Sequence, residues 1–200
     1  DIYISKGDIN GYENYLASVP FANVSVASLD SVTYEIGENH YLAEECDKAV
    51  KAFTTYLDKY PQGHFSLNAH YFKADCELRA NYLNEAYLDY KKVLERKNNE
   101  FTEQALLSAG GLALDLHLSE DAIAHYLQLE ELATTPENKS LAIYQLMKLY
   151  ATVENDEQLK LYAEKLLMEK KISKPKQEMA MIHLAELALK EDNYNKAYIY

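Results

Sequence analysis

The sequence predicts an all-α fold, an α-α superhelix (solenoid) of about four to five antiparallel helix pairs. The first observation is a pattern of acid, alanine, aromatic and leucine that returns at nearly fixed intervals, in DKAVKAFTTYLD (47–58), NEAYLDYKKVLE (84–95) and EDAIAHYLQLEE (120–131). The second is the low content of helix breakers, with six glycines and four prolines among 200 residues. The third is the scarcity of strand patterns, because apolar residues recur mostly at the spacing of an amphipathic helix.

Each repeat is anchored by a small residue and an alanine twelve positions later. The anchor pairs are Gly37 and Ala49, Ala74 and Ala86, Gly110 and Ala122, and Ala185 and Ala197. The aromatics Phe53, Tyr90, Tyr126 and Tyr162 continue the pattern at intervals of 37, 36 and 36 residues. A small residue in mid-helix lets two backbones approach closely, and the aromatic fills the space beside the contact. Glycine inside a helix costs about 1 kcal/mol relative to alanine, so Gly37, Gly110 and Gly111 are predicted close-contact sites.

The anchors make residues 1–200 one solenoid segment. Because the chain opens on Asp1 and ends within a helical pattern, we expect an excerpt of a longer protein. Residues 66–80 and 82–96 are the predicted first and second helices of one repeat, joined by a short polar turn. The predicted divisions are 1–17 (the end of a truncated repeat), 28–61, 64–97, 100–134, 136–171 (a degenerate repeat, with Leu146 and Gln158 at the small-residue places) and 175–200 (a truncated repeat).

Local signals mark the boundaries between these elements. Thr135, Ser119 and Asn155 precede helical patterns and are predicted N-caps. The β-branched run 22–29 is predicted to be a longer connection, and the lysine-rich stretch 169–176 a solvated loop. All four prolines fall between predicted helices, at Pro20, Pro61, Pro136 and Pro175.

Composition limits the classes of partner. The formal net charge of −12 and the pI near 4.9 disfavour nucleic acid and anionic lipid, since both are recognised by clustered lysine and arginine. No apolar run approaches the about 18–20 residues that span a bilayer. Cys46 and Cys76 lack zinc-site spacing. We expect two buried thiols, with the alternative of a disulfide between neighbouring helices, which would suit an oxidising compartment.

The residues of catalysis and metal binding are not arranged in a recognisable motif. The six histidines form no HExxH, HxH or Cys–His spacing. His117, in the turn before Ser119, is better explained as part of a helix cap than of a catalytic pair. The sequence therefore predicts a protein that is not an enzyme and has no cofactor or metal.

The spacing of Gly37, Ala49, Phe53 and Pro61 resembles the tetratricopeptide repeat (TPR) family. That family usually repeats after about 34 residues, whereas the intervals here are 36 to 39. The motif around YPQGHFSLNAHYFKA (60–74) is similar to the longer repeats of bacterial cell-envelope TPR proteins, including outer-membrane assembly lipoproteins and the coordinator of the Tol–Pal system. The resemblance implies a bacterial periplasmic or cell-envelope location, with the cytoplasm as the alternative.

In TPR proteins the first helices of the pairs line a concave groove, so the resemblance also implies a binding surface. Tyrosine suits such a surface because it offers a large rigid area and a hydroxyl group. The alternative is that several of these residues are core contacts between neighbouring repeats. Glu38 and Asp75 stand where chaperone-binding relatives need neutral or basic groups, which favours an extended or basic peptide instead. The predicted groove residues are Tyr34, Glu38, Tyr41, Asn68, Tyr71, Asp75, Arg79, Gln104 and Leu107.

These expectations combine into a non-catalytic scaffold that binds a protein or peptide partner in its groove. The alternative is a glycan-binding or glycan-uptake accessory protein that uses the groove tyrosines. Self-association through exposed terminal helices is a further possibility that the helical pattern at the chain's end raises.

Overall fold

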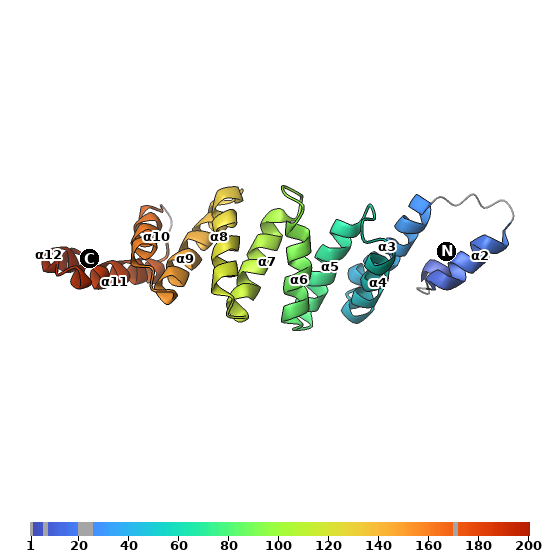
Figure 1. Cartoon of the computed structure of the whole chain (residues 1–200), viewed down its shortest axis with the longest axis horizontal. Coiled ribbons are helices and arrows are strands. Elements are labelled where there is room, and N and C mark those ends of the chain that lie inside the picture. The colour runs from blue at the N-terminus through green and yellow to red at the C-terminus, as the bar shows by residue number, and fades with distance from the viewer. Residues whose placement is uncertain (1, 6–7, 20–25, 170–171) are drawn as a thin grey trace. The chain divides into compact units, whose positions relative to one another are not determined.

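The computed structural model describes residues 2–5, 8–19, 26–169 and 172–200, and every regular element in those ranges is a helix (Figure 1). The predicted all-α fold is confirmed. The helices are α1 (Ile2–Ser5), α2 (Ile9–Ser18), α3 (Val26–Leu42), α4 (Cys46–Lys59), α5 (Ser66–Arg79), α6 (Leu83–Leu94), α7 (Thr102–Asp115), α8 (Ser119–Leu132), α9 (Pro136–Thr152), α10 (Asp156–Met168), α11 (Lys174–Lys190) and α12 (Tyr194–Ile199).

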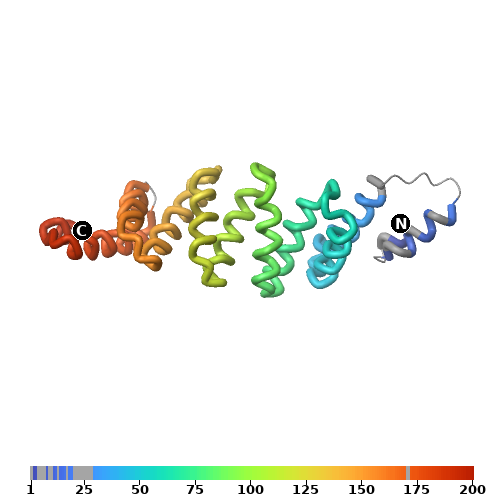
Figure 2. Tube along the Cα trace, viewed as in Figure 1, coloured from blue at the N-terminus to red at the C-terminus, as the bar shows by residue number. Residues whose placement is uncertain are grey.

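The chain divides into two compact units, one ending at Ala105 and the other beginning at Leu106, so that α7 starts in the first unit and continues in the second. In the first unit α3, α4, α5 and α6 pack consecutively, each against the next (Figure 1). In the second unit α8 to α12 do the same (Figure 2). Consecutive packing of helices joined by short connections is the arrangement expected of helical repeats. The division of the chain into the predicted repeats stays a prediction.

The turn inside each helix pair has the same backbone geometry every time. One residue adopts the left-handed conformation, with φ between 54° and 64°, and the next N–H bonds to a carbonyl five residues back, as in Glu45 to His40 and Tyr82 to Glu77. This is the Schellman ending, which stops a helix and redirects the chain. In these five turns the left-handed residues are Glu44, Asn81, His117, Glu154 and Asp192, separated by 37, 36, 37 and 38 residues. A further left-handed residue, Asn98, lies between α6 and α7. The backbone therefore repeats with the period that the side chains predict.

Two of the three predicted close-contact glycines lie against an aromatic ring. A Cβ atom on Gly37 would lie 2.5 Å from the Phe53 ring, and one on Gly110 would lie 2.9 Å from the Tyr126 ring. Real Cβ atoms do not approach other atoms so closely, so only glycine fits without a shift of the ring. The prediction for Gly111 is wrong, because a Cβ there would meet no atom within 4 Å.

A buried carboxylate fixes the connection between α4 and α5. Asp30 of α3, only 8% exposed, accepts hydrogen bonds from the Tyr56 hydroxyl (2.5 Å) and from the backbone N–H of His64 (2.8 Å). The same hydroxyl accepts a bond from the backbone N–H of Phe65 (3.0 Å). Burial and the bond to Asp30 raise the pKa of Tyr56. These bonds join α3, α4 and the start of α5 into one rigid corner, and a Cβ on Gly63 would lie 2.4 Å from the Tyr56 hydroxyl.

Helices α5 and α6 are joined by a buried ionic network. Lys73 donates to Glu77 (2.7 Å) and to Asp89 (2.5 Å), and His70 Nδ1 lies 2.5 Å from the other oxygen of Asp89. Glu77 is 3% exposed, and its Oε2 has no hydrogen-bond partner among the residues that the structure describes. Burial raises the pKa of Glu77 to about 7 against the opposing effect of Lys73. Burial alone would also raise the pKa of Asp89, but the bonds from His70 and Lys73 hold it below its ordinary value.

Four boundary predictions need correction or fall outside the described ranges. Pro20 and residues 22–25 lie outside them, but α3 already begins at Val26, so the predicted connection 22–29 is too long. Valine costs a helix less than about 0.7 kcal/mol, which tertiary packing easily outweighs.

Helix α11 begins at Lys174, inside the predicted loop, because Pro175 fits the first helical turn. Ser119 is the first residue of α8 and Leu118 its N-cap, whereas Thr135 and Asn155 cap as predicted.

Replacing each glycine of α7 by alanine tests the close contact between Gly110 and the Tyr126 ring. We expect Gly110→Ala to lower the free energy of unfolding by about 1–3 kcal/mol, because the new methyl group forces the Tyr126 ring to move. The control, Gly111→Ala, meets no neighbour and should raise it by up to about 1 kcal/mol through helix propensity. Urea unfolding followed by circular dichroism measures the free energy of unfolding of both variants. Equal changes in the two variants would contradict the close packing of Gly110 against Tyr126.

The Glu77 carboxyl group makes stability depend on pH. Its folded pKa of about 7 exceeds the model-compound value of 4.5, so folding favours the neutral form. The stabilisation is complete below pH 4.5 and is lost as the pH rises through 7. We therefore expect the protein to be less stable at about pH 8 than at about pH 5, and this difference to shrink in Glu77→Gln. Glu85→Gln, at an exposed site on α6, is the control and should retain the full difference in urea unfolding.

Candidate functional site

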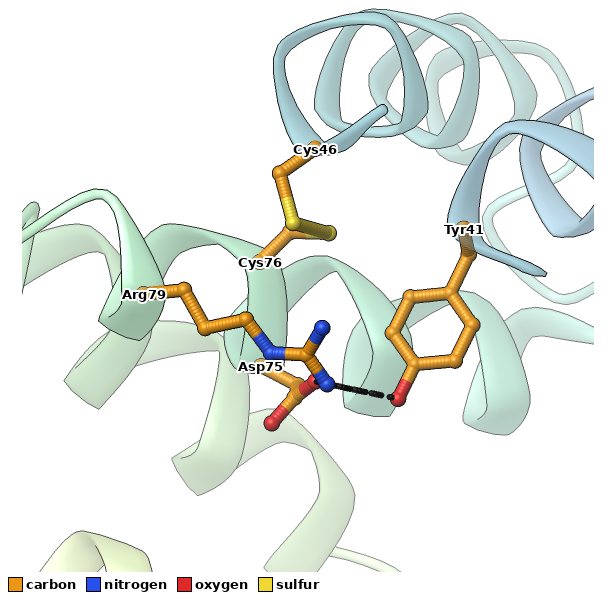
Figure 3. Close-up of a disulfide and its surroundings, with 5 residues drawn as sticks. All are labelled: Tyr41, Cys46, Asp75, Cys76 and Arg79. Carbon is orange, nitrogen blue, oxygen red and sulfur yellow. Dashed lines mark hydrogen bonds and ion pairs between the residues drawn. A yellow bond between two sulfur atoms is a disulfide. The ribbon is translucent and has the colours of Figure 1, made fainter. Parts of the chain in front are cut away.

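The first helices of two neighbouring repeats, α3 and α5, bring predicted groove residues together in the first unit. Tyr41 of α3 donates a hydrogen bond from its hydroxyl to Asp75 of α5 (3.0 Å). Arg79, one turn further along α5, forms an ion pair with Asp75 (2.6 Å) and donates to the Tyr41 hydroxyl (3.5 Å). Figure 3 shows the Arg79 guanidinium group reaching toward the Tyr41 ring, whose centroid lies 5.5 Å from the guanidinium carbon. We call these three residues the Tyr41–Asp75–Arg79 cluster.

The cluster is polar, charged and only partly covered. The side chain of Arg79 is 50% exposed and that of Asp75 is 25% exposed. Burial and the bond to Asp75 raise the pKa of Tyr41, so its hydroxyl remains a donor across the physiological pH range. An exposed ion pair of this kind contributes at most about 1 kcal/mol to stability. Its groups can therefore exchange their present partners for those of a ligand at low cost.

The Tyr41 ring is held in place by Phe72, whose centroid lies 4.6 Å away. Phe72 in turn lies 6.3 Å from Phe53, inside the core of the first unit. Sequence reasoning did not assign Phe72 a role in the site. The only signal was its place beside Tyr71 on a predicted groove helix.

A disulfide lies next to the cluster. Cys46, the first residue of α4, pairs with Cys76 of α5, with Cα atoms 5.0 Å apart (Figure 3). The expectation of two free thiols is wrong, and the alternative of a disulfide between neighbouring helices is confirmed. Because Cys76 directly follows Asp75, the bond ties the cluster's α5 backbone to the adjacent repeat.

Tyr34 and Glu38 precede Tyr41 in α3, and Tyr34 belongs to the core. Tyr34 is 3% exposed and stacks on Phe65 with centroids 4.6 Å apart. Its hydroxyl donates to Glu38 (2.9 Å), which is half-buried. Burial, followed by this bond, raises the pKa of Tyr34. Tyr34 is therefore a core residue, whereas Glu38 keeps a partly exposed carboxylate on α3.

The remaining predicted groove residues do not join the cluster directly. Tyr71 is half-buried and stacks on Phe101 with centroids 4.2 Å apart, so one ring face is used in packing. Asn68 is half-buried on α5, and Gln104 is exposed in the first turn of α7. Leu107 is half-buried in the second unit. The binding role of all nine residues stays a prediction.

The tyrosine rings bear on the predicted glycan alternative. Sugars would need an open aromatic face, but Tyr34 and Tyr71 both stack on phenylalanine rings.

Across residues 2–5, 8–19, 26–169 and 172–200, no group of three or more His, Cys, Asp or Glu side chains could hold a metal ion. In the same ranges no helix is long and apolar enough to cross a membrane.

No protein-family model matches the chain, and no curated protein matches it by sequence. Solved structures do match. MamA is 17% identical over 86% of this chain and 87% of its own, with a TM-score of 0.59. YrrB, described as a TPR protein with an unusual peptide-binding site, is 14% identical over 83% of this chain and 79% of its own, with a TM-score of 0.60. A TPR protein from Parabacteroides merdae is 15% identical over 98% of this chain and 72% of its own, with a TM-score of 0.53.

These similarities show that the chain has the fold of tetratricopeptide-repeat proteins. At 14 to 17% identity they show the fold alone. The predicted fold is thereby confirmed. The expectation, drawn from the TPR resemblance, that the chain folds as tetratricopeptide-repeat proteins do is confirmed as well.

Removing the disulfide should destabilise the first unit. The bond joins residues separated by 30 positions, and closing a loop of that length contributes about 2–4 kcal/mol. We expect the free energy of unfolding of the Cys46→Ser, Cys76→Ser double variant to be lower by that amount, so that the variant unfolds at a lower urea concentration. Dithiothreitol should shift the wild-type protein to the same midpoint and leave the double variant unchanged. A wild-type midpoint that reducing agent does not move would contradict a stabilising disulfide.

Proposed function

We propose that the protein is a non-catalytic interaction scaffold that binds an extended peptide or protein segment on the α3–α5 face. This face is defined by Glu38, Tyr41, Asn68, Tyr71, Asp75 and Arg79. The observation that carries the proposal is the Tyr41–Asp75–Arg79 cluster, which sits half-exposed on a rigid base of aromatic rings and a disulfide. Residues that bind partners are usually held by such rigid surroundings.

The chemistry of the face suits a peptide. Arg79 offers several N–H donors to backbone carbonyls, and Asp75 accepts bonds from backbone N–H groups or from a basic side chain. Tyr41 adds a flat apolar surface beside them, a combination found at the centres of protein interfaces. With Glu38 also on this face, the net local charge is negative, which favours an extended segment carrying basic residues.

One of the similar structures supports this choice of ligand. YrrB is described as a TPR protein with an unusual peptide-binding site. That description belongs to YrrB, but the shared fold makes peptide binding a reasonable use of the first helices here. Self-association of the terminal helices, which we also expected, stays a prediction.

The disulfide supports a location in an oxidising compartment, which for a bacterial protein is the periplasm or the cell envelope. Disulfides persist there and are rare in a reducing cytosol. The Cys46–Cys76 bond joins neighbouring repeats next to the proposed binding face. A role in an envelope assembly is therefore part of the proposal.

Peptide selection tests the binding face. We expect phage display against the wild-type protein to enrich extended sequences with basic residues, and Arg79→Ala or Tyr41→Ala to weaken binding of a selected peptide by about tenfold or more, a loss of about 1.4 kcal/mol. Lys51→Ala, at an exposed position on α4, is the control and should bind as wild type does.

Isothermal titration calorimetry with a selected synthetic peptide gives the affinities. Circular dichroism melting confirms that each variant is folded. Peptides that bind all three variants equally would place the binding surface elsewhere and refute the proposal.

A further inference from the structure

A pocket of about 370 Å³ opens in the first unit, between the α4–α5 connection, the first turns of α5 and the end of α6. This volume lies within the range of about 300–1,000 Å³ typical of ligand sites. Its wall includes the apolar residues Pro61 and Leu67, the polar residues Ser66 and His70, and the cations Lys92 and Arg96. None of them belongs to the α3–α5 face.

The pocket lies on a different side of α5 from that face. Ser66 and His70 are one turn apart and point toward α6, where His70 meets Asp89. With about 3.6 residues per turn, Asp75 and Arg79 fall roughly half a turn around the helix from Ser66. The two surfaces can therefore be tested independently.

The wall of the pocket carries net positive charge in a chain whose formal charge is −12. Lys92 and Arg96 are cations, and the one acidic residue lining the pocket, Glu95, is paired with Lys92 at 2.8 Å. This leaves the charge of about one cation to attract a ligand. A single negative charge would match it, whereas a doubly charged phosphate would exceed it.

The Arg96 guanidinium group is fixed before any ligand arrives. Arg96 donates from Nη2 to the Ser66 hydroxyl (2.5 Å), and that hydroxyl donates to the Gly63 carbonyl (2.9 Å). The Asn99 side-chain amide donates to the backbone carbonyls of Val93 (3.0 Å) and Arg96 (2.5 Å), which fixes the end of α6. A guanidinium group has five N–H donors, arranged to bind both oxygens of a carboxylate.

The rest of the wall suits the remainder of an acidic side chain. Pro61 and Leu67 provide an apolar surface for methylene groups. His70 presents Nδ1 to Asp89, so the ring nitrogen that it can offer to the pocket is Nε2. The pocket thus combines a cationic group, further polar groups and an apolar wall within one small volume.

We propose that this pocket binds the carboxylate of an aspartate or glutamate side chain on a partner protein segment. Arg96 and Lys92 hold the carboxylate, and Pro61 and Leu67 contact its methylene stem. The site adds a second, acidic specificity to a scaffold whose α3–α5 face favours basic residues. Sequence analysis missed it, although Lys92 and Arg96 form an i, i+4 basic pair at the end of a predicted helix.

Nuclear magnetic resonance titration of the ¹⁵N-labelled chain tests this assignment. The probe is N-acetylglutamic acid α-amide, and its neutral isostere N-acetylglutamine amide is the ligand control. We expect the acid to bind in the millimolar range and to shift the backbone amide signals of Ser66, Leu67, His70 and Arg96. The neutral isostere should leave them in place, and inorganic phosphate should bind more weakly than the acid.

Variants connect the shifts to the cationic groups. Lys92→Gln and Arg96→Gln should each weaken binding of the acid at least threefold, and Arg96→Lys should recover part of the loss. Lys51→Gln and Arg79→Gln, which lie outside the pocket, should bind as wild type does. The Arg79 variant also separates this site from the proposed peptide face, because only the latter depends on it.

Three results would overturn the proposal. Equal shifts with the neutral isostere would show that the pocket does not distinguish a charged side chain from a neutral one. Tighter binding of phosphate would assign the pocket to another anion. Full binding by Lys92→Gln, which removes an exposed side chain and leaves the fold intact, would show that these cations do not hold the ligand.

Discussion

The close approach of two helices at a small residue is the constraint on which the rest of the structure depends. At Gly37 and Gly110 the space for a Cβ atom is occupied by the aromatic ring of the partner helix. Ala74 occupies the equivalent position in the next repeat, where Ala74, Ala86 and the Tyr90 ring are all buried. At Gly37 and Gly110 the small residue lets the two helices of a pair approach closely, and the left-handed turn residue sets the direction in which the second helix returns. The stacking of successive first helices follows from these two local features.

Helix α5 shows how this packing supports function. On one side it meets α6 through Lys73 and Asp89, a buried pair whose loss would leave an uncompensated charge. On the other it is tied to the preceding repeat by the bond between Cys46 and Cys76. A helix fixed from both sides can present Asp75 and Arg79 to solvent in one geometry. Preorganisation of this kind reduces the entropy lost when a partner binds.

Most of the fold could be predicted from the sequence because the repeat is encoded in local residue types. Apolar spacing, small residues and turn residues each act within a few positions, so the periods of 36 and 37 residues appear in the letters and again in the backbone. The wrong predictions concern contacts that the period does not determine. Gly111 has the same residue type as Gly110 but points away from every neighbouring atom. A position one place along a helix turns by about 100°, and composition cannot indicate which glycine faces the ring.

The candidate site was harder to predict, for a related reason. The family resemblance predicts which residues lie on the groove side of the first helix of each pair. It does not predict which of them are exposed and which are buried in the core. Tyr34 and Tyr41 both occupy α3, yet the first stacks on Phe65 in the core while the second reaches Asp75 at the surface. The pairing of the cysteines likewise depends on how two helices approach, and a sequence separation of 30 does not reveal a Cα separation of 5.0 Å.

Lys92 and Arg96 admit an explanation that involves no ligand, and it can be compared with the proposed pocket. Cations near the end of a helix are stabilised by its partial negative charge, by about 0.3–1 kcal/mol each. That effect accounts for their sign and for their place at the end of α6. It does not account for the direction of Arg96, whose guanidinium group crosses to Ser66 at the start of the facing helix. Nor does it account for the volume of about 370 Å³ between Arg96, His70 and Leu67. The helix end explains the charge, and the proposed carboxylate ligand explains the charge and the pocket together.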